Sequence, residues 1–207
     1  MSNGVEFVTI TGIDEWTDLG RIQAMSARFP VEWAILMSPD LQGLHPRFPA
    51  HETIDAFRSL PVKKAAHLCG AHAKAVMAGG EPAVELAGFD RAQINHRRPV
   101  PELIAGFAFR NGVQGIMQSR TVEFPEAPDV QMLYDRSGGH GRLPPEWPVH
   151  PGMLVGIAGG ISPATIATVL ATIPAGPVWL DMETGVRTDE DRLDLDMAEA
   201  VLAATFG

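Results

Sequence analysis

With 207 residues, 45% of them hydrophobic, the chain is long enough to bury one substantial core and short for two, so we expect a single domain over residues 1–207. The formal net charge of −9 argues against nucleic acid as the main partner, because binding a phosphate backbone needs clustered lysine and arginine, and Arg97-Arg98 is the one dense basic spot.

Cysteine usage and hydropathy point to the cytoplasm. Cys69 is the only cysteine, so no disulfide can form within the chain. No apolar run approaches the roughly 18 residues of a membrane span, and residues 1–10 lack the basic and apolar regions of a secretory signal. We therefore expect a cytoplasmic protein with no membrane partner.

Short apolar or β-branched runs alternate with amphipathic segments, which is typical of parallel strands joined by helices. There are eight such runs, at residues 6–11, 32–37, 63–69, 91–95, 115–120, 131–135, 153–158 and 177–183. Eight parallel strands predict a closed (β/α)8 (TIM) barrel of the α/β class. A doubly wound open sheet would also alternate, but its glycine fingerprint should follow the first strand, and ITGIDEW is not one.

The connections between these runs are uneven. Periodic segments predict helices at residues 14–28, 51–59, 70–79, 99–110, 162–173 and 189–204, with an acidic run, TDEDRLDLDMAEA, forming the first turns of the last one. Strands five and six are followed by short or proline- and glycine-rich stretches, so we expect reduced helices there. The edge left by them would be capped by the proline-rich loop, through Trp147, or covered in a homodimer.

Two glycine turns near the C-terminus predict a phosphate site. AGGISP (residues 158–163) follows the seventh strand and DMETGV (residues 181–186) ends the eighth. Backbone N–H groups at such turns bind phosphate at the last two strand ends of parallel barrels. The candidate phosphate-binding residues are Gly159, Gly160, Thr184 and Gly185, and the expected partner is a small phosphorylated or anionic metabolite.

Five motifs, in order and in approximate spacing, resemble those of the phosphoribosylanthranilate isomerases. They are TITGI at the start, QINH (93–96), LYDRSGGHG (133–141), AGGISP and DMETGV. The resemblance spans nearly the whole chain. It implies a (β/α)8 barrel that performs an Amadori rearrangement in tryptophan biosynthesis, converting the ribosyl amine of an anthranilate-bearing sugar phosphate into an amino-ketose, with no metal and no redox cofactor.

The resemblance assigns the acid and shows a change at the base. Asp135 ends strand six and corresponds to the family's general acid, which protonates the ring oxygen as the furanose opens; its structural alternative is an Asx turn or N-cap in the RSGG loop. Thr11 stands where the family has its catalytic cysteine. A hydroxyl ionises far above pH 7, so Thr11 could act only through a bound water.

Two other groups could serve as the base. Glu183 stands where the family has a phosphate-ligating serine, and it could act as a base opposite Asp135 or bind a different substrate; the alternative is an ion pair with Arg187 or exposure to solvent. Cys69, beside His67, could supply a thiol from strand three, or it could be packed core. Together with His72 these residues do not have standard ligand spacing, so no metal is expected.

The remaining candidates would bind substrate. Because side chains two apart in a strand share a face, Gln93 with Asn95 and Asp181 with Glu183 are expected at the barrel mouth. Arg47 corresponds to the family arginine that holds the anthranilate carboxylate, and its alternative is a surface arginine. His140 could donate a hydrogen bond to a phosphate or lie in an exposed turn.

Three classes of function follow from these residues. The first is an isomerase-like enzyme that acts by acid–base chemistry on a phosphoribosyl or amino-sugar phosphate compound. The second is an aldolase, epimerase or lyase on another small polar metabolite, although a Schiff-base aldolase is disfavoured because no lysine ends a strand. The third is a barrel that has lost its base and binds a phosphometabolite without catalysis.

Overall fold

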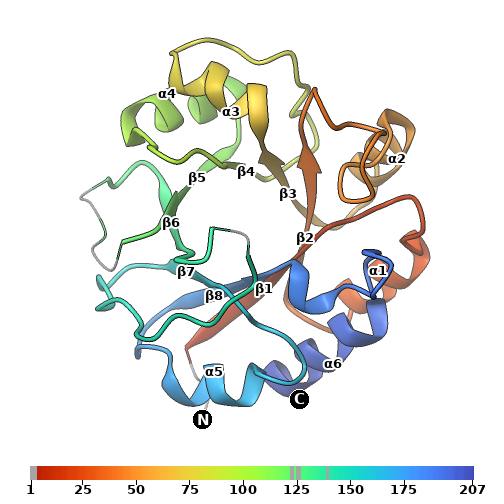
Figure 1. The fold of residues 1–207 in the computed structure, drawn as a ribbon, viewed down its shortest axis with the longest axis vertical. Coiled ribbons are helices and arrows are strands. Elements are labelled where there is room, and N and C mark those ends of the chain that lie inside the picture. Colours follow the sequence, from red (N-terminus) through yellow and green to blue (C-terminus); the bar gives the residue numbers. More distant parts are fainter. Residues whose placement is uncertain (1–3, 122–123, 125–126, 139) are drawn as a thin grey trace.

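Eight parallel strands close into one barrel in sequence order (Figure 1), which confirms the predicted (β/α)8 architecture. The computed structural model describes residues 4–121, 124, 127–138 and 140–207. The strands are β1 (Val5–Thr11), β2 (Val31–Met37), β3 (Lys63–Leu68), β4 (Arg91–Ile94), β5 (Gln114–Ser119), β6 (Gln131–Tyr134), β7 (Val155–Ala158) and β8 (Val178–Met182). The helices are α1 (Leu19–Ser26), α2 (His51–Arg58), α3 (Gly70–Met77), α4 (Pro101–Asn111), α5 (Ile166–Thr172) and α6 (Leu195–Phe206), with a 3₁₀ turn, η1 (Thr184–Val186).

The strands are buried on both faces, because helices cover the outside and side chains fill the inside. The main core lies between the sheet and the helices. A second, smaller apolar cluster fills the barrel and contains Trp179 and Leu133. Gly156 makes room for it, since a Cβ there would lie 2.4 Å from both side chains.

A buried ion pair lies inside the barrel and packs against this apolar cluster. Arg91 Nε donates to Glu32 Oε2 at 2.7 Å, and the guanidinium stacks on Phe7 and Trp179, with its Cζ 4.9 and 4.6 Å from the ring centroids. Thr9 adds a hydrogen bond of 3.0 Å to Glu32. A buried charge pair needs such additional partners to offset its desolvation. The Arg91–Glu32 pair also places two charges below the barrel mouth.

The helices after strands five and six are reduced, as the sequence predicts. In the described residues no helix lies between β5 and β6 or between β6 and β7. Trp147 covers part of this side, where it meets Tyr134 edge-on at 6.3 Å between ring centroids and donates to Thr172 Oγ1. The strands here still pair, so the barrel is closed without a helix.

The last helix begins six residues later than the sequence predicts. Residues 188–194 form a turn in which Thr188 N donates to Arg192 O and Asp191 adopts a left-handed φ of 61°. Arg187 holds this turn through Asp191. Asp194 then caps α6 by accepting from the backbone N–H groups of Asp196 and Met197. The prediction of helix from residue 189 was wrong because the Thr188–Arg192 backbone bond and the contacts of Arg187 with Asp191 stabilise a turn there instead.

The cap makes a simple stability test. Asp194→Ala should lower the free energy of unfolding by about 1 kcal/mol, since two N–H groups at the start of α6 lose their acceptor. Urea denaturation measures this change, and Asp189→Ala, at an exposed position in the preceding turn, is the control. An equal loss in both variants would contradict the assignment of the cap.

Among the described helices none is both long and apolar enough to cross a bilayer.

Candidate active site

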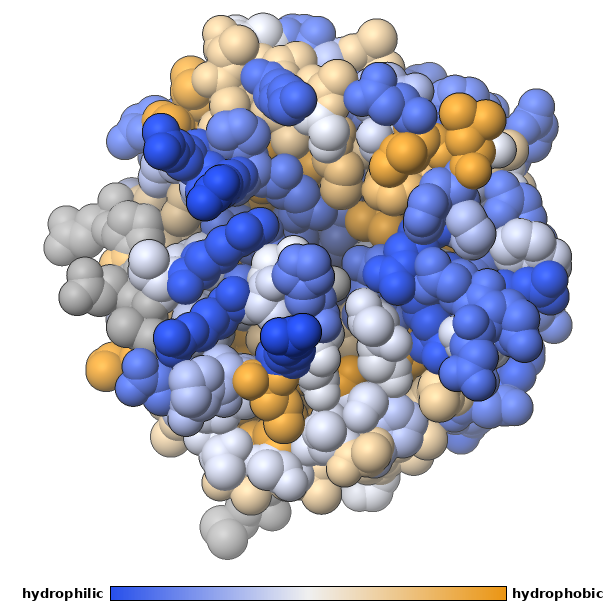
Figure 2. Space-filling view, in the orientation of Figure 1, coloured by the Kyte–Doolittle hydropathy of each residue, from blue (hydrophilic) through white to orange (hydrophobic). Residues whose placement is uncertain are grey.

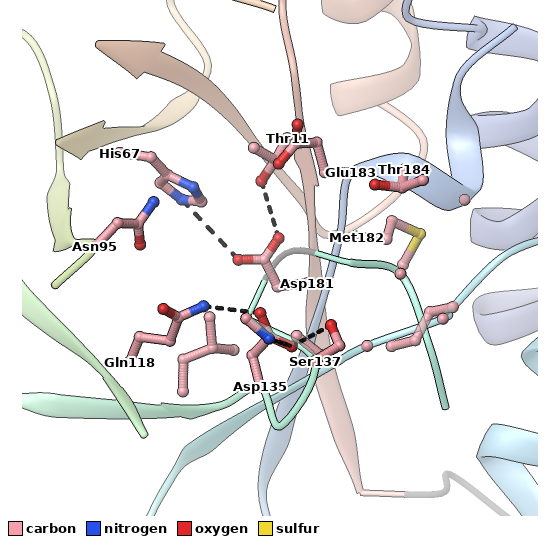
Figure 3. A pocket seen from close by; sticks show the side chains of 18 of the residues that line it. Thr11, His67, Asn95, Gln118, Asp135, Ser137, Asp181, Met182, Glu183 and Thr184 are labelled. Atoms are coloured by element: carbon pink, nitrogen blue, oxygen red, sulfur yellow. Dashed lines mark hydrogen bonds and ion pairs between the residues drawn. The ribbon is translucent and has the colours of Figure 1, made fainter. Parts of the chain in front are cut away.

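A cavity opens at the carboxyl ends of the strands, where parallel barrels place their chemistry. Hydrophilic residues lie on two sides of the hollow near the centre of this face (Figure 2). Its lining comes from β1, β3, β4, β5, β6, β7 and β8 and the loops that follow them. Ten of the lining residues are labelled in Figure 3. The cavity therefore brings together residues from both ends of the chain.

Asp135 is buried at the end of β6, and its carboxylate lines the cavity. Gln118 Nε2 donates to Oδ2 at 2.7 Å, while Ser137 Oγ and Gly138 N donate to Oδ1 at 2.7 and 3.1 Å (Figure 3). The last two bonds hold the RSGG loop, and the backbone donor lies three residues after Asp135, as it does at an N-cap rather than in an Asx turn. The same carboxylate thus organises the loop and faces the cavity.

Asp181 is buried on β8 and faces the cavity from the other side (Figure 3). Thr11 Oγ1 donates to Asp181 Oδ1 at 2.8 Å. His67 Nε2 lies 4.0 Å from Oδ2, beyond hydrogen-bond distance, and has no hydrogen-bond partner among the described residues. Thr11 is therefore hydrogen-bonded directly to a carboxylate.

Burial sets the protonation of this group of side chains. Burial raises the pKa of Asp181 to about 7, against the lowering effects of the Thr11 hydrogen bond and the Arg91 charge. Burial, with Arg91, lowers the pKa of His67 to about 3. His67 is therefore neutral near pH 7, whereas both the protonated and the ionised form of Asp181 are populated at that pH.

Gln93 and Asn95 share a face of β4 and its extension, as strand alternation predicts. Gln93 Nε2 donates to Asn95 Oδ1 at 2.8 Å, and both residues line the cavity. Gln93 Oε1 is buried and has no hydrogen-bond partner in the described structure. Asn95 Nδ2 also contacts Cys69 Sγ at 3.3 Å.

Cys69 lies behind this amide and outside the set of described residues that line the cavity. Burial raises the pKa of its thiol to about 11, against the lowering effect of Asn95. Such a thiol is protonated at neutral pH and is a weak base.

The four predicted phosphate-binding residues converge on one side of the cavity, together with Gly141. Gly159 and Gly160 have φ of 104° and 67°, and Cβ atoms there would approach backbone atoms of Arg142 and Leu143 at 2.8 and 2.4 Å. A Cβ on Gly185 would lie 1.9 Å from the carbonyl oxygen of Ile161. Only glycine fits these contacts, so backbone forms this wall of the cavity.

Arg47 and Glu183 form an ion pair beside the mouth. Arg47 Nη1 is 2.8 Å from Glu183 Oε1, and Arg47 Nε is 2.9 Å from both carboxylate oxygens of Asp191. The suggested ion pair of Glu183 with Arg187 was wrong. Arg187 instead forms an ion pair with buried Asp14, with 3.1 Å between Nη2 and Oδ2. Burial raises the pKa of Glu183, and Arg47 opposes this effect. Glu183 lines the cavity, whereas Arg47 is not among its lining residues.

His140 is exposed, and it too is absent from the described lining. Three further polar side chains line the cavity without having been predicted from the sequence: those of Gln118, Arg120 and Ser137. The strand alternation that ends β5 could have indicated Gln118 and Arg120. Arg120 lies close to Gly138: a Cβ added to Gly138 would be 2.6 Å from Cζ of Arg120.

Within the described residues no group of three or more histidine, cysteine, aspartate or glutamate side chains could hold a metal ion. His67, Cys69 and His72 therefore do not form such a cluster.

Comparison with solved structures places this arrangement in a known architecture. The chain is similar to TrpF from Jonesia denitrificans, with a TM-score of 0.66, 16% identity and 96% of each chain covered. It is also similar to the phosphoribosyl anthranilate isomerase of Thermus thermophilus, with a TM-score of 0.62, 22% identity, and 95% of this chain and 96% of that one covered. The resemblance seen in the motifs is thus confirmed for the fold.

A third similar structure is a phosphoribosyl anthranilate isomerase in complex with reduced 1-(o-carboxyphenylamino)-1-deoxyribulose 5-phosphate. Its TM-score is 0.61 at 15% identity, and 97% of this chain and 98% of that one are covered. No protein-family model matches the sequence, and no curated protein matches it.

Proposed function

We propose that this protein is an isomerase that rearranges a phosphoribosyl or amino-sugar phosphate compound by acid–base chemistry of the Amadori type. The observation that carries the proposal is the shared cavity: two buried carboxylates, Asp135 and Asp181, face the same space as a wall of glycine backbone. An aldose-to-ketose rearrangement needs an acid and a base on the substrate and an anchor for its phosphate.

Asp135 is the proposed acid. In its protonated form it gives a proton to the ring oxygen as the furanose opens, and the nitrogen lone pair forms the Schiff base. Gln118, Ser137 and the Gly138 N–H fix the carboxyl group in one orientation. Pre-orientation of this kind removes the cost of ordering the acid at the moment of reaction.

The glycine wall is the proposed phosphate anchor. A similar solved structure is a complex with a ligand that carries a 5-phosphate, which supports this proposal. The structure offers a less favourable binding site for the anthranilate carboxylate. Arg47 is engaged by two carboxylates, so a substrate carboxylate would have to displace Glu183 or Asp191 to reach it. We therefore define the substrate by its sugar phosphate rather than by its aromatic group.

Gly185→Ala tests the anchor. The new Cβ would overlap the Ile161 carbonyl oxygen, and this overlap must displace η1. We expect binding of ribose 5-phosphate to weaken by about 10- to 100-fold, the range for losing a hydrogen bond to a charged group. Isothermal titration calorimetry measures this. Gly106→Ala, in the middle of α4, is the matched control, and equal affinity in both variants would contradict the anchor.

An assay of the purified protein for phosphoribosylanthranilate isomerisation, followed by the change in anthranilate fluorescence, tests the function itself. We expect turnover that ribose 5-phosphate inhibits competitively. No turnover together with ribose 5-phosphate binding would replace this proposal with a non-catalytic phosphometabolite-binding barrel.

A further inference from the structure

The base of the proposed reaction needs a new assignment, because threonine occupies the position of the family's catalytic cysteine. The geometry points to Asp181 as the base that removes the proton from C2 of the substrate, with Thr11 as the residue that positions it. This inference rests on the proposed function and names the second catalytic group of the same site.

The contact between the two residues is the first observation. Thr11 donates a hydrogen bond of 2.8 Å to Asp181 Oδ1, and both side chains are buried and line the cavity. The bond leaves Oδ2 without a hydrogen bond from the described residues, with His67 Nε2 at 4.0 Å. Figure 3 shows this carboxylate between Thr11, His67 and the loop that carries Asp135.

Two orphaned polar atoms nearby are a second, independent observation. His67 Nε2 and Gln93 Oε1 are buried and have no hydrogen-bond partner among the described residues, and both residues line the cavity. Buried polar groups are almost always paired, so such atoms at a cavity wall indicate partners that a ligand supplies. Hydroxyl groups of a sugar both donate and accept, which suits an imidazole nitrogen and an amide oxygen.

The other candidate bases are less suited. Glu183 is held by Arg47 at 2.8 Å, which favours its charged form but occupies one of its oxygens with a cation. The Cys69 thiol is absent from the described cavity lining, and its sulfur accepts a hydrogen bond from Asn95 Nδ2. Asp181 is both buried in the cavity and free of a cation in direct contact among the described residues.

The proton transfer from C2 follows formation of the Schiff base. Once the Schiff base has formed, Asp181 Oδ2 takes the hydrogen from C2, and the C2–H electrons form a C1=C2 double bond while the C1=N electrons move to nitrogen. The protonated Asp181, whose proton exchanges with solvent, returns a proton to C1 of the enaminol, and the enaminol hydroxyl proton passes to solvent, which gives the amino-ketose. No oxidant or metal enters this balance.

The electrostatic surroundings suit this role. Asp181 is influenced by Thr11, by His67 across the 4.0 Å gap, by Arg91 and Glu32 below, and by Glu183 beside it. Burial raises the pKa of Asp181 to about 7, and the Thr11 hydrogen bond lowers it. A base whose pKa lies near the working pH combines a large ionised fraction with sufficient strength.

The test uses three variants of the full chain and the phosphoribosylanthranilate assay. Asp181→Asn should lower kcat by at least about 100-fold, the usual contribution of a general base. Thr11→Val, which keeps the shape but removes the donor, should move the acidic limb of the kcat/KM profile to higher pH, because the lowering effect on Asp181 is lost. Thr11→Ser restores the donor and should restore the position of the limb.

The outcomes separate two failures. A wild-type protein that does not turn over the substrate overturns the proposed function, and the base with it. A wild-type protein that is active while Asp181→Asn retains its rate overturns only the assignment of the base. If Thr11→Val lowers kcat without moving the acidic limb, Thr11 is structural and does not position the base.

Discussion

Replacing Asp135 with asparagine should lower kcat by roughly 10²- to 10⁴-fold, the contribution typical of a positioned general acid. Asparagine cannot donate a proton to the ring oxygen, so the furanose would have to open without acid assistance. Its side-chain oxygen can still accept from Ser137 Oγ and Gly138 N, and the loop should therefore keep its shape. Gln118 must turn its amide, because its donor would otherwise face the new NH₂ group.

Asp129→Asn is the matched control for this variant. Asp129 is exposed in the loop that precedes β6, so the substitution makes the same change in charge without touching the cavity. Steady-state kinetics with circular dichroism of each variant distinguishes lost chemistry from lost structure. An Asp135→Asn enzyme as active as Asp129→Asn would remove Asp135 from the reaction.

Asp181→Asn should stabilise the protein even though it removes activity. The folded protein holds the proton of Asp181 up to about pH 7, whereas in the unfolded chain an aspartate releases its proton near its usual pKa of about 3.9. A raised folded-state pKa contributes stability at low pH, and this contribution is lost as pH rises from about 4 to 7. An asparagine side chain does not ionise, so the variant does not lose this stability as pH rises.

The size of this effect follows from the shift. A difference of about three pKa units corresponds to at most about 4 kcal/mol, reached above pH 7. His67, whose lowered pKa acts over a similar pH range with the opposite sign, is present in both proteins and largely cancels in the comparison. Urea unfolding of wild type and Asp181→Asn from pH 4 to 9 measures the difference. A difference that does not change with pH would mean that Asp181 is ionised normally in the folded protein.

Much of the fold follows from local patterns in the sequence. Apolar runs separated by amphipathic segments fix eight strands, and the absence of such a segment after strands five and six predicts the missing helices. Local pattern failed at residues 189–194, where acidic residues with helical spacing form a turn. Contacts with distant residues help to decide the structure there: Asp191 accepts from Arg47, 144 residues away, and Leu193 N donates to Asp14, 179 residues away. These contacts cannot be deduced from neighbouring residues.

The site is predicted only in part for the same reason. Alternation along strands places Gln93, Asn95 and Asp181 toward the mouth, and motif spacing places the glycine turns. Alternation does not say which side chains meet across the barrel. The bond from Thr11 to Asp181 joins residues 170 apart, and the pairing of Arg47 with Glu183 joins residues 136 apart. These contacts decide which carboxylates are available for chemistry.

The most direct test of the account is to run the proposed rearrangement in D₂O and read the product by NMR. If the protein isomerises phosphoribosylanthranilate by proton abstraction at C2, the amino-ketose should carry one deuterium at C1 and no hydrogen at C2. Product that forms without deuterium at C1 would contradict a base that exchanges its proton with solvent. The absence of any product would contradict the central claim that this barrel is an acid–base isomerase of this sugar phosphate.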